Sequence, residues 1–427
     1  MKTTLICTVG GSHEPIVKAI ESLRPDFVAF VCSRDDPATG RAGSHVQVTG
    51  QGKVIRARRE DDKPSLPAIP QQVGLETEQF EVLLVQPDSL DDVYDRVMGW
   101  LSARDRERER IHADYTGGTK TMSAALVTAA LDDGQVDLHL VSGNRADLTR
   151  VTSGTEVMMP ASVARTRFRR RLAQAAASWR HHAYDETHDQ LESMGPPADQ
   201  GLQGDYLRLR DLSRAFSLWD RFDHAAARDA LSSYRQILGR DAGIRPLLVI
   251  LDYLVGDKPA SEPLRLYDLW RNAERRAGQG RYDDAMARVY RLLEWTAQWL
   301  LRQYAGIETA DVPPDRVPEH VSLTPGQDGR LKAGLFNAWE LAAHHGNDDL
   351  ADFWRRERTH VLDLLQARNL SILAHGFRPL GEAQWRRMES WMEQAFLPML
   401  LSNTSGKPIR VAELPPQLPR TCPGIEA

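Results

Sequence analysis

The sequence predicts an α/β domain built on a parallel sheet, followed by an all-α region. Over the first 160 residues, short apolar runs rich in β-branched residues alternate with helix-like stretches, which is typical of a parallel sheet covered on both faces. After residue 160 the strand signals stop and helical patterns continue to about residue 402. A chain of 427 residues is also too long for one ordinary core, so we expect two or three domains.

The first 160 residues contain the strand signals. Strands are expected at 4–9, 27–32, 80–85, 111–115 and 138–141, and helices at 15–23, 90–103 and 121–131. Between the second and third strands, residues 45–58 alternate apolar and polar about the turn at 49–52, which predicts an inserted hairpin. A last strand pair, 148–152 and 156–159, is expected to close the domain at Pro160.

The helical part divides at its Pro- and Gly-containing joints. Helical segments are expected at 161–194 (as one long helix or two abutting ones), 205–238, 245–255, 264–304 with a split at 278–280, 331–344, 348–373 and 382–401. We therefore predict four parts: an α/β domain over 1–160, a helical connector over 161–260, a helical domain over 261–402, and a tail over 403–427. The tail is Pro-rich with little apolar content, so we expect it to be mobile.

Composition excludes several classes of protein. The net charge of −5 argues against a protein that coats nucleic acid through positive charge alone. No apolar run approaches the roughly 18 residues of a membrane span, so no membrane association is expected. The three cysteines are odd in number, which favours a reducing, cytoplasmic setting, and they lack metal-ligand spacing. We predict no metal site and no required cofactor.

Two Gly-rich loops follow predicted strands and precede predicted helices. The first is Thr8-Val9-Gly10-Gly11-Ser12, and the second is Asp114-Tyr115-Thr116-Gly117-Gly118-Thr119-Lys120-Thr121. In open parallel sheets, ligands bind at the carboxyl ends of strands where the strand order reverses, and a helix N-terminus offers N–H groups to a phosphate. Neither loop has the spacing of a P-loop or of a dinucleotide fingerprint. The glycines alone could make a tight turn, but the accompanying hydroxyls and Lys120 favour phosphate or ribose binding.

A candidate catalytic segment lies near the end of the helical region, at Arg368-Asn369-Leu370-Ser371-Ile372-Leu373-Ala374-His375. Seven residues are nearly two helical turns, so Arg368 and His375 would lie on one helix face about 10 Å apart. A guanidinium binds a phosphate bidentately and an imidazole moves protons near neutral pH, which suits metal-free RNA cleavage. The similar pairs Arg106…His112 and Arg355…His360 lie in charge runs that indicate solvated helix faces.

Together, the loop at 8–12, the segment at 114–122 and the segment at 368–376 resemble the CARF–HEPN ribonucleases of type III CRISPR systems. The resemblance implies a Rossmann-like CARF domain that senses a nucleotide and a helical HEPN ribonuclease domain, each of which dimerises. It also implies a cyclic oligoadenylate as allosteric activator and single-stranded RNA as substrate, cut to a 2′,3′-cyclic phosphate. On this basis tetra-adenylate is slightly favoured over hexa-adenylate.

The resemblance also assigns roles to residues. Arg368 would stabilise the phosphate, His375 would act as acid or base or would position the 2′-hydroxyl, and Asn369 would assist. The activator pocket would be lined by Thr8, Gly10, Gly11, Ser12, Thr116, Gly117, Gly118, Thr119, Lys120 and Thr121. Some CARF domains also cleave their ligand slowly, and Thr8, Ser12, Thr119 and Lys120 are the polar groups placed for that chemistry, although binding alone explains them.

Two other functions fit the same residues. The chain could be a non-enzymatic cyclic-nucleotide sensor whose helical half binds a partner or DNA. It could also be a toxin-like HEPN nuclease whose N-terminal domain senses a different nucleotide. An RNA reporter assay separates the first of these from a ribonuclease, and a ligand screen by thermal shift separates the second, since tight ligands stabilise the folded state by several kcal/mol.

Overall fold

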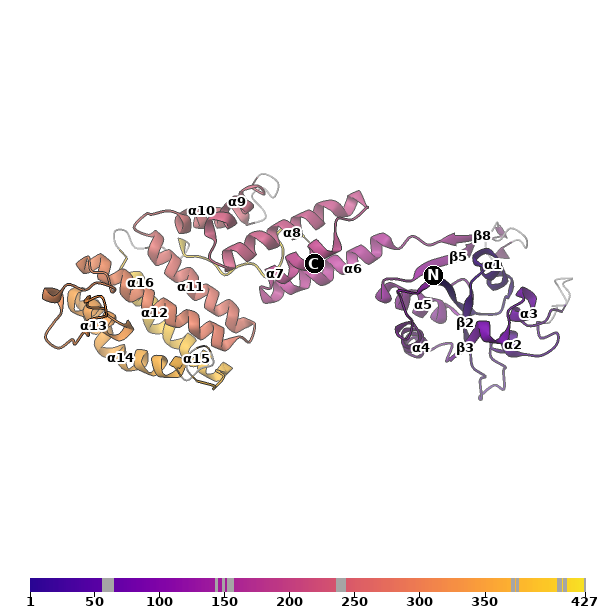
Figure 1. Cartoon of the computed structure of the whole chain (residues 1–427). Coiled ribbons are helices and arrows are strands. Elements are labelled where there is room, and N and C mark those ends of the chain that lie inside the picture. Colours follow the sequence, from indigo (N-terminus) through magenta and orange to yellow (C-terminus); the bar gives the residue numbers. More distant parts are fainter. Residues whose placement is uncertain are drawn as a thin grey trace. The chain divides into compact units, whose positions relative to one another are not determined.

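The computed structural model divides into two compact units, Met1–Arg169 and Arg170–Ala427. It describes residues 1–55, 65–142, 145–147, 150–151, 157–235, 243–369, 373, 376–404, 409 and 413–425. The division falls inside helix α6 (Ala164–Ala177). We call the two parts the N-terminal unit and the C-terminal unit (Figure 1). None of the described helices is long and apolar enough to cross a membrane.

The N-terminal unit is built on a six-stranded sheet with the strand order β3-β2-β1-β4-β5-β8. Its strands are β1 (Lys2–Val9), β2 (Phe27–Ser33), β3 (Phe80–Val85), β4 (Glu109–Asp114), β5 (Asp137–Ser142) and β8 (Val157–Pro160). The first five are parallel, and β8 is antiparallel to β5. This confirms the predicted Rossmann-like parallel sheet. The strand order reverses between β1 and β4, which makes their carboxyl ends the topological switch point.

Helices cover both faces of this sheet, which explains why most residues of β1 and β2 are buried. On one face, α1 (Glu14–Leu23), α2 (Val46–Thr49) and α3 (Ile69–Val73) pack on alternate residues of β1, namely Leu5, Cys7 and Val9. On the other face, α4 (Leu90–Ser102) and α5 (Lys120–Asp133) pack on Ile6 of β1 and on Ile111 and Ala113 of β4. Figure 1 shows α4 and α5 on one side of the strands and α1 on the other.

Two expectations about this unit are wrong. The alternating stretch expected to form a hairpin at 45–58 contains helix α2, and Val48 lies in the core with α1. The alternation over the four residues of α2 is too short to distinguish a strand from a helical turn. The helical turn forms because it buries Val48 in the core with α1. The expected strand at 156–159 is present as β8, but its expected partner is wrong: β8 pairs with β5, while β6 (Arg145–Asp147) pairs with β7 (Arg150–Val151). Residues 56–64, 148–149 and 152–156 lie outside the described residues.

The C-terminal unit is helical throughout its described residues, as predicted. Its connector contains the end of α6, then α7 (Tyr184–Met194), α8 (Gln200–Asp220), α9 (His224–Ser232) and α10 (Ile244–Val255). The stretch at 161–194 thus forms two helices, joined by a 3₁₀ turn at Ser178–His181. The stretch expected to be helical at 205–238 breaks between α8 and α9, because Phe222 has a left-handed backbone and Asp223 caps α9 through the N–H of Ala226.

One apolar cluster unites the remaining helices. These are α11 (Ser261–Gly278), α12 (Tyr282–Ala305), α13 (Leu335–His345), α14 (Asp348–Asn369), α15 (Glu382–Trp391) and, after a π-helical turn at Met392–Phe396, α16 (Leu397–Ser402). Trp270 of α11 stacks on Trp385 of α15 with ring centroids 5.5 Å apart, and Trp339 of α13 stacks on Trp354 of α14 at 5.7 Å. Aromatic pairs of this kind add to the stability that burial already supplies.

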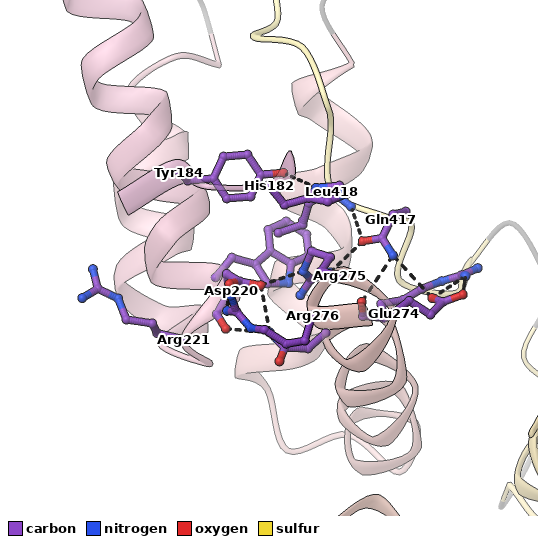
Figure 2. A network of polar contacts seen from close by, with 12 residues as sticks. His182, Tyr184, Asp220, Arg221, Glu274, Arg275, Arg276, Gln417 and Leu418 are labelled. Carbon is purple, nitrogen blue, oxygen red and sulfur yellow. Dashed lines mark hydrogen bonds and ion pairs between the residues drawn. The ribbon is translucent and has the colours of Figure 1, made fainter. Parts of the chain in front are cut away.

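A buried ionic network joins the connector to α11 (Figure 2). Asp220, at the end of α8, accepts hydrogen bonds from the Nε of Arg275 at 2.6 Å and from the Nδ2 of Asn272 at 2.8 Å, and it is also ion-paired with Arg276. The Arg275 side chain is fully buried. Because removing Asp220 would leave the buried Arg275 guanidinium without its carboxylate partner, this contact strongly constrains how α8 and α11 pack.

The predicted mobility of the tail is wrong for residues 413–425. Leu418 is buried, and the side-chain oxygen of Gln417 accepts a hydrogen bond from Arg275 at 2.9 Å (Figure 2). The Tyr184 hydroxyl on α7 donates to the carbonyl of Pro419 at 2.7 Å, and Arg208 on α8 donates to that of Gly424 at 2.6 Å. The few apolar residues of the tail gave no indication of this packing. Most of the contacts are made by backbone carbonyls, which every residue type has.

We predict that Leu418→Ala destabilises the C-terminal unit by about 2–4 kcal/mol, the usual cost of emptying a buried leucine site. Urea unfolding of the full chain, followed by hydrogen exchange in α7 and α11, measures the change. Thr421→Ala is the matched control, because Thr421 is exposed in the same segment. Equal stability of the two variants would show that the tail does not pack as described.

Candidate functional site

The two Gly-rich loops meet at the switch point of the N-terminal sheet. β1 ends at Val9 and β4 ends at Asp114, and the two strands are neighbours, with Cys7 opposite Asp114. The loop after β1 leads into α1, and the loop after β4 leads into α5 on the other face of the sheet. The structure therefore brings the predicted activator-pocket residues of the two loops to the place where open α/β sheets bind ligands.

The glycines are required by contact between the two loops. A Cβ atom on Gly10 would lie 2.5 Å from the backbone nitrogen of Gly118, and one on Gly117 would lie 2.2 Å from the carbonyl oxygen of Thr8. Gly118 also has a φ of +79°, which disfavours other residues. In contrast, a Cβ on Gly11 would meet nothing within 4 Å. The tight-turn interpretation thus accounts for three of the four glycines, and only Gly11 has open space beside it.

Most of the loop hydroxyls also hold the loops together. Thr8 is buried and donates to the carbonyl of Gly117 at 2.7 Å. The Thr119 hydroxyl accepts from the N–H of Met122 at the start of α5 and donates to the carbonyl of Pro87 at 2.7 Å. The Thr116 hydroxyl accepts from the N–H of Val141 at 2.7 Å. The hydroxyls of these three threonines are therefore engaged with backbone groups of the protein.

The groups that stay accessible are suited to an anion. Gly11, Ser12 and Lys120 are exposed, and Thr121 is half-buried. Lys120 is the first residue of α5, whose N-terminal end offers backbone N–H groups and the positive end of the helix dipole. A lysine ammonium beside a helix N-terminus favours phosphate over cationic or apolar ligands.

Sequence reasoning missed two residues at this site. Gln47 on α2 donates its side-chain amide to the carbonyl of Gly10, so the insertion between β2 and β3 contacts the first loop. No local pattern marked Gln47, because its partner is 37 residues away. Asp114 is fully buried; one carboxylate oxygen accepts from the N–H of Thr116 at 3.0 Å, and the other has no hydrogen-bond partner in the described structure. Asp114 is the last residue of β4, and its place at the end of a strand next to the second Gly-rich loop was the available signal.

The predicted catalytic segment is described only in part. Arg368 and Asn369 are the last two residues of α14, and their side chains lie outside the described part of the chain. His375 is likewise outside the described residues. Up to this point α14 packs through Phe353, Trp354 and Val361 against the apolar cluster of the domain. The predicted closeness of Arg368 and His375 on one helix face stays a prediction.

The two other Arg–His pairs have ordinary structural roles. Arg106 lies in a turn before β4 and is ion-paired with Asp133, whereas His112 lies in β4 with its Nδ1 2.8 Å from the Nε2 of His139. The expectation of a solvated helix face is therefore wrong for this pair. Arg355 is exposed on α14 and paired with Asp352 at 2.9 Å, as that expectation requires.

We predict that Gly118→Ala destabilises the N-terminal unit by about 1–3 kcal/mol, since the new Cβ would lie 2.9 Å from the Cβ of Thr8 at a positive φ. Hydrogen exchange of β1 and β4 amides as a function of urea measures the loss. Gly11→Ala is the matched control and should leave stability unchanged, because its Cβ meets open space. Equal losses in both variants would contradict the loop contact.

Burial raises the pKa of Asp114 from 3.8 to about 6. The folded state therefore binds this proton more tightly than the unfolded state, and stability falls as pH rises from about 4 to about 6. The loss is about 3 kcal/mol at most, since each pKa unit corresponds to about 1.4 kcal/mol. We predict that Asp114→Asn flattens this decline and raises the unfolding free energy at pH 8. Asp88→Asn, at an exposed carboxylate, should do neither.

Comparison with known proteins identifies the helical domain. Residues 257–396 match the family model described as the Csm6 HEPN domain, which spans α11 to the π-helical turn. A comparison with curated proteins found no match.

Three solved structures resemble the chain at low identity. Csm6 of Enterococcus italicus, bound to cyclic hexa-2′-fluoro-hexa-dAMP, is 14% identical over 94% of each chain with a TM-score of 0.48. A type III CRISPR defence DNA nuclease activated by cyclic oligoadenylate is 15% identical over 50% of this chain and 34% of its own, with a TM-score of 0.25. Can2 of Sulfobacillus thermosulfidooxidans, in complex with cyclic tetra-adenylate, is 13% identical over 56% of this chain and 68% of its own, with a TM-score of 0.24.

All three TM-scores lie below 0.5, so the assignment depends on the HEPN match and on the order of the domains. The HEPN match follows an α/β unit whose parallel sheet carries two Gly-rich loops at its switch point. The chain thus combines a match to the Csm6 HEPN domain over residues 257–396 with a preceding parallel-sheet unit, which is the domain order that the CARF–HEPN resemblance implies.

Proposed function

We propose that this protein is a ribonuclease of type III CRISPR defence that a cyclic oligoadenylate activates. The observation that carries the proposal is the combination, in one chain, of a Csm6-type HEPN domain with a switch-point site whose accessible groups suit phosphates. A cyclic oligoadenylate presents several phosphates in a ring. In a dimer, two copies of the exposed set Gly11, Ser12 and Lys120 could contact that ring from both sides.

The proposed chemistry uses only groups of the protein and the RNA. The 2′-hydroxyl attacks the adjacent phosphorus, the bond to the 5′-oxygen of the next nucleotide breaks, and the products are a 2′,3′-cyclic phosphate and a 5′-hydroxyl. The Arg368 guanidinium holds the phosphate oxygens, and His375 takes or gives a proton, with Asn369 assisting. The segment is supplied by each copy of a homodimer, and the activator favours the arrangement in which the two segments cooperate.

Ring cleavage by the N-terminal unit is not part of this proposal. Of the four polar residues considered for it, Thr8 and Thr119 have hydroxyls that donate to loop carbonyls and so hold the loops in place. Ser12 and Lys120 remain accessible and are sufficient for binding.

The test is cleavage of a quenched single-stranded RNA reporter by the full chain, with rings of three to six adenylates and with EDTA. We expect cleavage only when a ring is present, with tetra-adenylate tried first and hexa-adenylate second. Arg368→Ala and His375→Ala should each lower the rate at least about 100-fold, the scale of lost acid–base or phosphate contacts.

Arg355→Ala is the matched control, since Arg355 lies on the same helix in the other Arg–His pair and is paired only at the surface. Loss of activity in the control but not in Arg368→Ala would overturn the site assignment. Ring binding without RNA cleavage would favour the non-enzymatic sensor, and cleavage that no oligoadenylate alters would favour a nuclease gated by another nucleotide.

A further inference from the structure

The connection between α14 and α15 presents a fully exposed aromatic side chain. Phe377 is 96% exposed, the highest value among the large apolar side chains in the described residues. The next residue, Arg378, is also exposed, and the structure gives it no ion pair within the described parts of the chain. A single exposed apolar side chain is common on protein surfaces, so its meaning depends on its position.

The chain just beyond Phe377 is anchored. The N–H of Leu380 donates to both carboxylate oxygens of Asp283 on α12, at 3.3 and 3.2 Å, and Leu380 packs against the apolar cluster of the HEPN domain. Helix α15 then begins at Glu382. Phe377 thus lies three residues before a fixed point, yet its ring is not taken into the neighbouring core, although burial of a phenylalanine would stabilise the fold.

Phe377 is also tied by the chain to the proposed catalytic segment. It lies two residues after His375, so whatever the backbone conformation, the two Cα atoms are at most about 7 Å apart. A phenyl ring extends several ångströms beyond its Cα, which brings it within reach of a base next to the scissile phosphate. Single-stranded RNA is bound by this pair of residue types, with bases stacked on aromatic rings and phosphates contacted by guanidinium groups.

We propose that Phe377 stacks on a base beside the scissile phosphate and that Arg378 contacts the adjoining RNA backbone. The inference rests on the proposed ribonuclease function and adds a substrate-contacting pair to it. A second copy of the chain is the other candidate occupant. Homodimer contacts favour contiguous apolar patches. In this connection, Leu373 is the only other exposed large apolar side chain among the described residues, and the charged Arg378 follows Phe377. These features favour RNA over a second copy as the occupant.

The test compares steady-state cleavage by the activated full chain and its Phe377 variants. Phe377→Ala should raise KM for the RNA about tenfold with little change in kcat, since stacking on one aromatic contributes to binding on that scale. Phe377→Trp should retain the wild-type KM, and Phe377→Leu should not, because leucine keeps apolar contact but cannot stack. Arg378→Gln should reduce the salt dependence of KM.

Leu362→Ala and Arg387→Gln are the matched controls, as both residues are exposed on the same domain, on α14 and α15. Each should leave KM unchanged. If the wild type cuts RNA and Phe377→Ala matches Leu362→Ala, the inference fails and the proposed function stands. If the activated wild type cuts no RNA, the proposed function fails and the inference fails with it.

Binding and mass measurements complete the test. In an Arg368→Ala background, which separates binding from cleavage, Phe377→Ala should weaken the affinity for a labelled single-stranded RNA by a similar factor in fluorescence anisotropy. Sedimentation should give both proteins the same mass. A smaller mass for Phe377→Ala would assign the ring to contact with a second copy and would overturn the proposal.

Discussion

The N-terminal site depends on the close approach of two backbones at the switch point, where Gly10 lies against Gly118. β1 and β4 are hydrogen-bonded neighbours whose following helices lie on opposite faces of the sheet, so their loops start side by side and then diverge. No side chain fits where they touch. The buried hydroxyl of Thr8 fastens one loop to the other, and the accessible residues Gly11, Ser12 and Lys120 are presented at the rim of this contact.

The C-terminal unit depends on a different kind of constraint, the buried ion pair between Asp220 and Arg275. Burying charged groups costs free energy unless they are paired and hydrogen-bonded. Nearly all polar atoms of this pair have hydrogen-bond partners, which favours one packing of α8 on α11 over alternatives. The same guanidinium holds Gln417 of the tail. One buried arginine therefore connects the connector helices, the first HEPN helix and the C-terminal segment (Figure 2).

Local sequence patterns predicted most elements but few of their partners. Apolar runs located β1 to β5, and the Pro and Gly joints separated the helices, because burial on two faces and backbone conformation are local requirements. Three predictions were wrong because residues distant in sequence decide the outcome. β8 pairs with β5, residues 46–49 form a helix that packs in the core with α1, and residues 413–425 are held by contacts of their carbonyls with α7 and α8. Gln47 at the candidate site was missed for the same reason.

The sequence by itself predicted the fold class, the two Gly-rich loops and, through their order along the chain with Arg368 and His375, the resemblance to CARF–HEPN ribonucleases. Those features depend on residue type and spacing, which a sequence displays directly. Only the tertiary structure decided that Gly10, Gly117 and Gly118 are needed for loop contact, that Asp114 is a buried carboxyl, and that Phe377 faces solvent. The glycine contacts and the burial of Asp114 depend on residues that are distant in the sequence, and the exposure of Phe377 means that no other part of the chain covers its ring. A local sequence pattern does not contain this information.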